Sequence, residues 1–239
     1  MTEKYIEDFN SFWEKIDNRT NFSFVRYADG EVMLMNNSPI QKNTQAYQND
    51  KWFSSGGQTK LGTDLNECIG LNDPNFYFAI SSKTDNIKDY NFLYDRIQNK
   101  SNITFANLWI NANYKENISR IRNINRDVVL ICNENCDLKN IPFNVSEFVP
   151  FPNDCVNYWE EHRDSFLEKI HNVSSKYKDT LFIICCGPTS AVIIKHMFTN
   201  NSNNTYIDFG SALDVFIHNK ITRPYMYEGS QYHNHISKF

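Results

Sequence analysis

The chain has 239 residues, of which 41% are hydrophobic and 15% are aromatic. This length and composition allow a substantial buried core and exclude a disordered protein. The formal net charge of −4 argues against a protein that binds nucleic acid by neutralising phosphates along one face.

Hydrophobic patterns predict an alternation of helices and strands along the chain. In chain order we expect a helix over 2–16, a strand over 22–26, a helix from 29, a polar and mobile loop over 36–60, a helix over 63–71, a strand over 76–81, a helix over 90–98, a strand over 103–110, a helix over 115–124, strands over 128–132 and 145–149, a helix over 158–177, a strand over 181–186, a helix over 190–198, a strand over 205–209 and a helix over 212–217.

This alternation predicts an α/β fold, Rossmann-like, with a mostly parallel sheet and helices on both faces. There is no internal repeat and no clear linker, so we expect one domain over 1–239. A polar tail follows from about residue 220. Its two histidines, His233 and His235, are expected to lie in solvent rather than to bind a metal.

The first candidate site follows the first predicted strand, in the stretch Arg26-Tyr27-Ala28-Asp29-Gly30-Glu31. The carboxylates of Asp29 and Glu31 are spaced to reach one hard divalent cation, Mn²⁺ or Mg²⁺, which shares its coordination with a diphosphate. Arg26 adds a cationic fork suited to phosphate. The alternative is a polar turn in which Arg26 and Glu31 form a surface ion pair.

The second candidate site lies where the buried strand over 181–186 runs into Gly187-Pro188-Thr189-Ser190 and a helix. Free backbone N–H groups at a helix N-terminus bind anions, so this turn suits a phosphate. The alternative is that Gly187 and Pro188 only turn the chain and Thr189 only caps the helix. Lys60, which follows the glycine-rich loop, is a further candidate to close on a phosphate.

These motifs, in this order, resemble the GT-D fold glycosyltransferases, which carry an Asp-x-Glu motif and use nucleotide sugars. The resemblance rests on Arg26-Tyr27-Ala28-Asp29-Gly30-Glu31, on Gly187-Pro188-Thr189-Ser190, and on Tyr206-Ile207-Asp208-Phe209-Gly210 followed by Asp214. Ala28 stands where the family has glycine, which is compatible with a negative φ. Ser211-Ala212 stands where the family tends to have histidine.

The resemblance implies transfer of a sugar from a nucleotide diphosphate sugar, with UDP as the favoured nucleotide, to a hydroxyl of a glycan or glycoprotein acceptor. Asp29 and Glu31 would then hold Mn²⁺ or Mg²⁺, assisted by Arg26. Gly187, Pro188, Thr189, Ser190 and Lys60 would receive the nucleotide or its phosphates. If the reaction inverts the anomeric centre, Asp208 or Asp214 would accept the acceptor's proton.

Two other functions remain open at this stage. A metal-dependent phosphoester or nucleotide hydrolase also needs carboxylates beside a phosphate, although the sequence lacks the further cluster that two-metal hydrolases show. A non-catalytic module that binds nucleotide sugars is the third possibility, because α/β folds host many functions.

The same features bear on location and partners. The acidic N-terminus, the absence of a long apolar run and six scattered cysteines favour a cytoplasmic protein, bacterial or viral, that can lie against a membrane-bound acceptor. We expect no nucleic-acid partner and no transmembrane segment, and an oligomer is compatible with the sequence.

Overall fold

The structure, a computed structural model, describes residues 2–40 and 54–239. The helices and strands of this part are α1 (Thr2–Asp17), β1 (Ser23–Tyr27), α2 (Asp29–Met35), α4 (Lys60–Cys68), β2 (Phe76–Ile80), α5 (Lys83–Arg96), η1 (Lys100–Asn102), β3 (Ile103–Phe105), η2 (Asn111–Asn113), α6 (Tyr114–Arg122), β4 (Val128–Asn133), η3 (Leu138–Asn140), β5 (Val145–Phe151), α7 (Cys155–Ser174), β6 (Leu181–Cys185), α8 (Thr189–Asn200), β7 (Thr205–Asp208), η4 (Gly210–Leu213), α9 (Asp214–Ile217), η5 (Pro224–Met226) and η6 (Gln231–Asn234).

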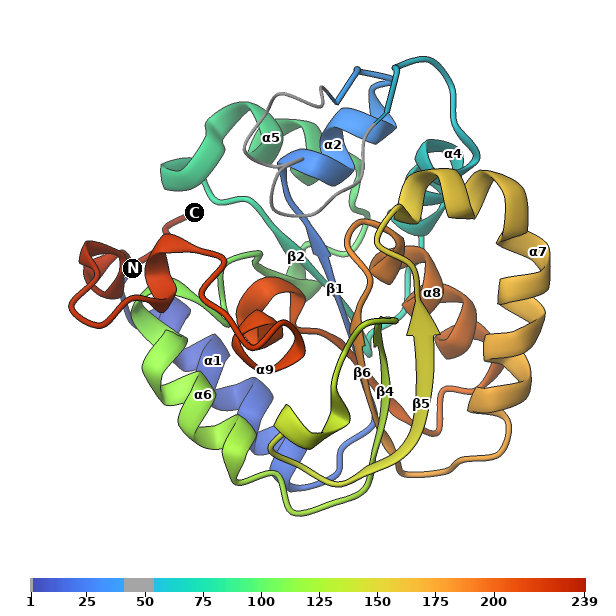
Figure 1. Ribbon diagram of the computed structural model, residues 1–239. Coiled ribbons are helices and arrows are strands. Elements are labelled where there is room, and N and C mark those ends of the chain that lie inside the picture. Colours follow the sequence, from blue (N-terminus) through green and yellow to red (C-terminus); the bar gives the residue numbers. More distant parts are fainter. Residues whose placement is uncertain (1, 41–53) are drawn as a thin grey trace.

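The strands form a seven-stranded sheet in the order β3-β2-β1-β7-β6-β4-β5, and every pair in it is parallel. Helices cover both faces: α1 and α6 lie on one side of the strands, and α7 and α8 on the other (Figure 1). The predicted α/β Rossmann-like class is therefore confirmed.

Two hydrophobic cores, one on each face, explain why the strands are apolar throughout. In β1, Phe24 packs into the core beneath α1, whereas Val25 and Tyr27 pack into the core beneath α2, α4, α7 and α8. Successive side chains of a strand point to opposite faces, so a strand covered on both sides needs an unbroken apolar run. The polar residues that follow such a run are left at the edge of the sheet.

Some elements differ from the sequence prediction at their ends. The strand expected over 103–110 stops at Phe105, and Leu108 and Trp109 enter the core from a turn instead. Helix α5 begins at Lys83 rather than at 90, because the Ser82 hydroxyl accepts a hydrogen bond from the Asp85 backbone N–H and caps its first turn. Much of the predicted 36–60 loop lies outside the described residues.

The tail from about residue 220 makes specific contacts with the rest of the protein, although many of its residues are exposed. His233 Nε2 lies 2.7 Å from the backbone oxygen of Tyr225, and His235 Nε2 lies 2.6 Å from Oδ1 of Asp85. These contacts cover both histidines in part, so the expectation that they lie in solvent is only partly met: the His235 side chain is still 38% exposed. The partner of His235 lies 150 residues earlier in the chain, which a local composition argument does not see, whereas the partner of His233 is only eight residues away.

A helix that crosses a bilayer needs about 20 mostly apolar residues. Within residues 2–40 and 54–239, no helix combines that length with that apolar character. The six cysteines all belong to this described part, and all six are free thiols.

Candidate active site

A pocket of about 200 Å³ opens at the carboxyl ends of five neighbouring strands. In open α/β sheets this edge is where ligands bind, in particular where the segments that follow adjacent strands leave toward opposite faces. Such a divergence occurs at β1 and β7, because α2 packs on one core and the η4–α9 segment on the other. The lining residues are Arg26, Ala28, Asp29, Gly30, Glu31, Asn133, Phe151, Pro152, Asn153, Cys155, Cys185, Cys186, Gly187, Pro188, Asp208, Gly210, Ser211, Asp214, Ile217, His218 and Arg223.

The end of β1 supplies the first charged group of the pocket. Arg26 is the half-buried residue of β1, whose other residues are buried. Its Nε donates to the backbone oxygen of Ala106 at 2.9 Å. Asp29 then begins α2 and is exposed. Glu31 turns back so that Oε2 accepts from the backbone N–H of Ala28 at 2.8 Å, which closes the first turn of the helix.

Ala28 occupies the junction between β1 and α2 without strain. Its φ is −123°, an extended conformation that any residue adopts. Alanine is therefore compatible with the local backbone at this position, as expected for a residue with a negative φ.

The end of β7 supplies the second charged group. Asp208 is only 4% exposed, and its Oδ1 accepts from the backbone N–H of Gly210 at 2.7 Å. Gly210 has a φ of +51°, and a Cβ at this position would lie 1.4 Å from Nη1 of Arg26. The guanidinium of Arg26 thus fills the space above Gly210, beside Asp208.

Burial raises the pKa of both inner carboxyl groups. Desolvation raises the pKa of Glu31 to about 7, against the opposing effects of its backbone hydrogen bonds and of Arg26. Desolvation raises the pKa of Asp208 to about 6, opposed by Arg26 and by the Gly210 N–H. The negative charge of Asp208 also contributes to the raised pKa of Glu31. The ionised form of a desolvated carboxylate is stabilised when a cation binds beside it.

The carboxylate oxygens suit a hard divalent cation such as Mn²⁺ or Mg²⁺. Among the described residues, no group of three or more Asp, Glu, His or Cys side chains is arranged to hold a metal. The donor set fits a cation that takes one or two protein carboxylates and completes its shell with substrate phosphates and water. Asp29 and Glu31 are the residues that would hold it.

The turn after β6 reaches the pocket through its backbone rather than through its hydroxyl groups. Gly187 and Pro188 line the pocket. Thr189 Oγ1 donates to the backbone oxygen of Cys186 at 2.5 Å, and Ser190 Oγ accepts from the Cys186 N–H at 2.9 Å. Both side chains are buried, so they fix the β6–α8 turn, and any ligand contact there would come from backbone groups.

Asp214 also lines the pocket, and its Oδ2 accepts from the hydroxyl of Thr222 at 2.6 Å. The structure therefore brings together seven of the predicted residues from three distant parts of the sequence: Arg26, Asp29 and Glu31, then Gly187 and Pro188, then Asp208 and Asp214.

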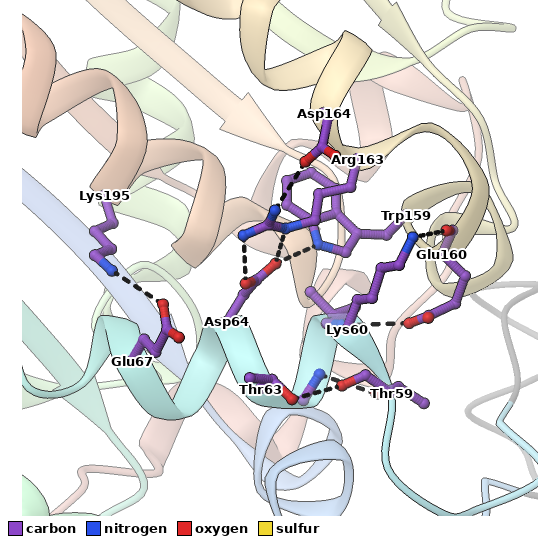
Figure 2. A network of polar contacts seen from close by, with 12 residues as sticks. Thr59, Lys60, Thr63, Asp64, Glu67, Trp159, Glu160, Arg163, Asp164 and Lys195 are labelled. Atoms are coloured by element: carbon purple, nitrogen blue, oxygen red, sulfur yellow. Dashed lines mark hydrogen bonds and ion pairs between the residues drawn. The ribbon is translucent and has the colours of Figure 1, made fainter.

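Lys60 does not line this pocket. It begins α4, and its Nζ donates to the backbone oxygen of Glu160 on α7 at 2.6 Å (Figure 2). Thr59 precedes it as the helix cap and accepts from the Gly62 N–H at 2.9 Å. Lys60 thus takes part in the contact between α4 and α7.

Sequence reasoning missed the part of the pocket that β4 and β5 contribute. Asn133 ends β4, and Phe151 ends β5, followed by Asn153. Asn133 Nδ2 donates to Oδ1 of Asn153, which joins the two loops. The available signal was the position of each residue at the carboxyl end of a buried strand.

Gly210→Ala should lower activity strongly while it lowers stability only slightly. The new methyl group would meet the Arg26 guanidinium, so Arg26 would have to leave its position beside Asp208. The positive φ adds a cost of roughly 1 kcal/mol. We expect the activity of Gly210→Ala to fall at least about tenfold, measured as initial rates together with the thermal midpoint. Gly57→Ala, at a φ of +87° with nothing within 4 Å of a Cβ placed there and outside the pocket, is the matched control for backbone strain.

The stability of the metal-free protein should fall as pH rises from about 5 to 8. The pKa of Glu31 and the pKa of Asp208 are higher in the folded protein than in the unfolded chain. Their contribution to stability is therefore fully present below about pH 4 and is lost as pH passes through about 6 and 7. We expect the thermal midpoint to drop by roughly 5–10 °C over this range.

The double variant Glu31→Gln/Asp208→Asn tests the source of this pH dependence. It should show a flatter profile of thermal midpoint against pH than the wild-type protein. An equally steep profile in the double variant would assign the pH dependence to other groups.

No family model matches the chain, and no curated protein matches it in sequence. Two solved structures resemble it. One is described as the highly conserved domain of unknown function 1792, which has a distinct glycosyltransferase fold; it shares 13% identity over 93% of this chain and 84% of its own, with a TM-score of 0.57. The other, a selenomethionine-substituted structure of domain of unknown function 1792, shares 13% identity over 96% of this chain and 88% of its own, also with a TM-score of 0.57. The chain therefore has a glycosyltransferase-like fold.

Proposed function

We propose that this protein is a metal-dependent glycosyltransferase that moves a sugar from a nucleotide diphosphate sugar, with UDP as the favoured nucleotide, to a hydroxyl of a glycan or glycoprotein. The observation that carries the proposal is the convergence of Asp29, Glu31, Asp208 and Arg26 with the Gly187 turn in one pocket at the strand ends. The glycosyltransferase-like fold supports the same reaction class.

The proposed roles follow from charge. Sugar transfer leaves negative charge on the departing nucleoside diphosphate. Mn²⁺ or Mg²⁺, when bound, would neutralise part of that charge. Arg26, fixed by its bond to the Ala106 oxygen, offers its remaining N–H groups to the same charge. Asp29 and Glu31 would hold the cation, and the backbone at Gly187 would contact phosphate oxygens.

The shape of the lining suggests how the donor lies. The acidic residues stand at the ends of β1 and β7, whereas Asn133, Phe151 and Asn153 stand at the ends of β4 and β5. Between β1 and β5 lie three strands, a span of about 19 Å at the usual strand spacing. We propose that the diphosphate lies at the acidic end and the nucleoside toward the amide-lined end.

If the configuration inverts, a carboxylate must accept the acceptor's proton. Asp208 and Asp214 both line the pocket, and the raised pKa of Asp208, about 6, suits a general base that works near neutral pH. The proposed enzyme works in the cytoplasm and meets a membrane-bound acceptor at the membrane surface.

A thermal-shift experiment tests the function. The purified protein is heated with a panel of nucleotide sugars, each with and without Mn²⁺. A ligand that binds only the native state raises stability by about 2.7 kcal/mol at a hundred times its dissociation constant. We expect a Mn²⁺-dependent shift with one nucleotide sugar, followed by transfer to an acceptor. The absence of a shift with every donor would contradict the proposal, and release of free sugar without transfer would favour a hydrolase.

A further inference from the structure

The segment 222–239 folds back onto the body of the protein and is anchored there by one carboxylate. Asp85, in the first turn of α5, accepts from His235 Nε2 through Oδ1 at 2.6 Å and from Ser237 Oγ through Oδ2 at 2.7 Å. Ser82 Oγ donates to the same Oδ2 at 2.6 Å. Two side chains of the segment therefore bind a carboxylate 150 and 152 residues earlier in the chain.

Apolar and backbone contacts strengthen this anchor. The ring of Phe239 stacks on Phe105 with centroids 4.1 Å apart and planes at 10°. The backbone N–H of Lys238 donates to Oγ1 of Thr84 at 3.0 Å, and Ser237 is fully buried. The end of the chain marked C accordingly lies beside α5 (Figure 1).

The beginning of the same segment reaches the pocket. Arg223 lines it directly. The hydroxyl of Tyr225 lies 2.7 Å from Oγ of Ser211, and the hydroxyl of Thr222 donates to Asp214 at 2.6 Å; Ser211 and Asp214 are both lining residues. The contact of His233 with the Tyr225 backbone oxygen joins this end to the anchored end.

The charge of the pocket indicates a role for Arg223 in binding an anion. Four carboxylates line it, those of Asp29, Glu31, Asp208 and Asp214, together with two arginines, Arg26 and Arg223. A diphosphate entering such a pocket is repelled by the carboxylates unless cations offset them. Guanidinium groups bind phosphate oxygens through paired N–H donors. Both arginines also make contacts within the protein: Arg26 Nε donates to the Ala106 oxygen at 2.9 Å, and Arg223 Nη1 donates to the Thr222 backbone oxygen at 3.4 Å.

We propose that segment 222–239 is part of the active site: Arg223 binds the diphosphate of the nucleotide donor, and Asp85, through His235 and Ser237, is the positioning residue that holds Arg223 in place. This inference rests on the proposed function. It assigns a role to a segment that lies, in sequence, beyond the motifs that led to that function.

The test measures the binding of UDP, GDP and ADP, each with Mn²⁺, by titration calorimetry. Arg223→Ala should weaken the affinity for the nucleotide that binds wild type by about 10–100-fold, the usual value of a charge-assisted hydrogen bond. His235→Ala/Ser237→Ala removes the anchor from the side of the segment and leaves the α5 cap intact. It should weaken the same affinity by roughly 3–10-fold. Lys178→Ala, which changes an exposed side chain outside the segment and outside the pocket, should bind as wild type does.

A double-mutant cycle separates positioning from general loosening of the structure. If the anchor acts through Arg223, removing it in the Arg223→Ala background should cause no further loss of affinity. Additive losses would overturn the positioning role of Asp85. The Arg223→Ala result stands even if the anchor variant is unstable, because Arg223 faces the pocket.

The outcomes also distinguish this inference from the function on which it rests. If wild type binds one of the nucleotides and Arg223→Ala binds it equally well, the inference fails and the proposed function survives. If wild type binds none of the three with Mn²⁺, the proposed function fails, and the inference fails with it.

Discussion

Asp29→Asn and Glu31→Gln should each lower the rate of sugar transfer by about a hundredfold to a thousandfold. Under the proposed function, each substitution would remove a negative charge that holds the divalent cation against the diphosphate. The loss of a preorganised electrostatic contact of this kind costs about 10²–10³ in rate. The fold should remain intact. Asp29 is exposed, and glutamine at position 31 keeps an oxygen that accepts from the Ala28 N–H.

Although Glu31→Gln should lower activity, it should raise the stability of the metal-free protein. Burial raises the pKa of Glu31 to about 7, so its ionised form is unfavourable in the folded, metal-free protein at pH 8. The neutral amide avoids that cost, and the thermal midpoint without metal should therefore rise at pH 8 while activity is lost. Addition of Mn²⁺ should stabilise the wild-type protein more than the variant.

Initial rates and thermal midpoints, measured with and without Mn²⁺, check both effects. Glu161→Gln is the matched control, because the Glu161 side chain is 74% exposed on α7 and does not line the pocket. Near-normal turnover in either site variant would show that these carboxylates do not hold a metal needed for the reaction.

Arg163→Met should lower the free energy of unfolding by about 3–5 kcal/mol, because it leaves the nearly buried Asp64 carboxylate without its charged partner, although the Arg163 side chain is itself 33% exposed. Arg163 on α7 binds Asp64 on α4 with two parallel contacts, Nε to Oδ2 at 2.7 Å and Nη2 to Oδ1 at 2.8 Å (Figure 2). These hydrogen bonds raise the pKa of Arg163. Trp159 Nε1 also donates to Oδ2 of Asp64 at 2.7 Å.

The size of the effect follows from burial. The Asp64 side chain is 11% exposed, so loss of Arg163 leaves a nearly buried carboxylate with Trp159 as its remaining side-chain donor among the described residues. For a chain of this length the thermal midpoint should fall by roughly 6–20 °C. Asp64→Leu/Arg163→Met, which removes both charges, should recover much of the loss.

The same arginine provides an internal control. Its Nη1 also binds Asp164 at 2.8 Å, but the Asp164 side chain is 86% exposed. Asp164→Asn should therefore change stability by less than about 1 kcal/mol. Equal losses in Arg163→Met and Asp164→Asn, measured by chemical denaturation, would contradict a dominant role for burial. Neither residue lines the pocket, so the turnover of the folded variants should be unchanged.

The sequence by itself determined the class of fold and the ends of the strands that carry the site. Apolar runs of strand length that alternate with helical patterns can bury both faces only as a parallel sheet covered by helices. In such a sheet the carboxyl ends of the strands meet at one edge. The residues at the carboxyl ends of β1, β6 and β7 or just after them, including Asp29, Gly187 and Asp208, were therefore predictable as neighbours.

The tertiary structure decided which strands are adjacent and what each polar group touches. Because β7 pairs with β1, Asp208 lies beside Arg26, and Gly210 makes room for the guanidinium. Lys60 donates to the backbone oxygen of Glu160 on α7, and His235 of the tail binds Asp85. These contacts join positions 100 and 150 residues apart. They depend on how whole elements pack, whereas a local pattern of residues records only the period and the polarity of its own segment.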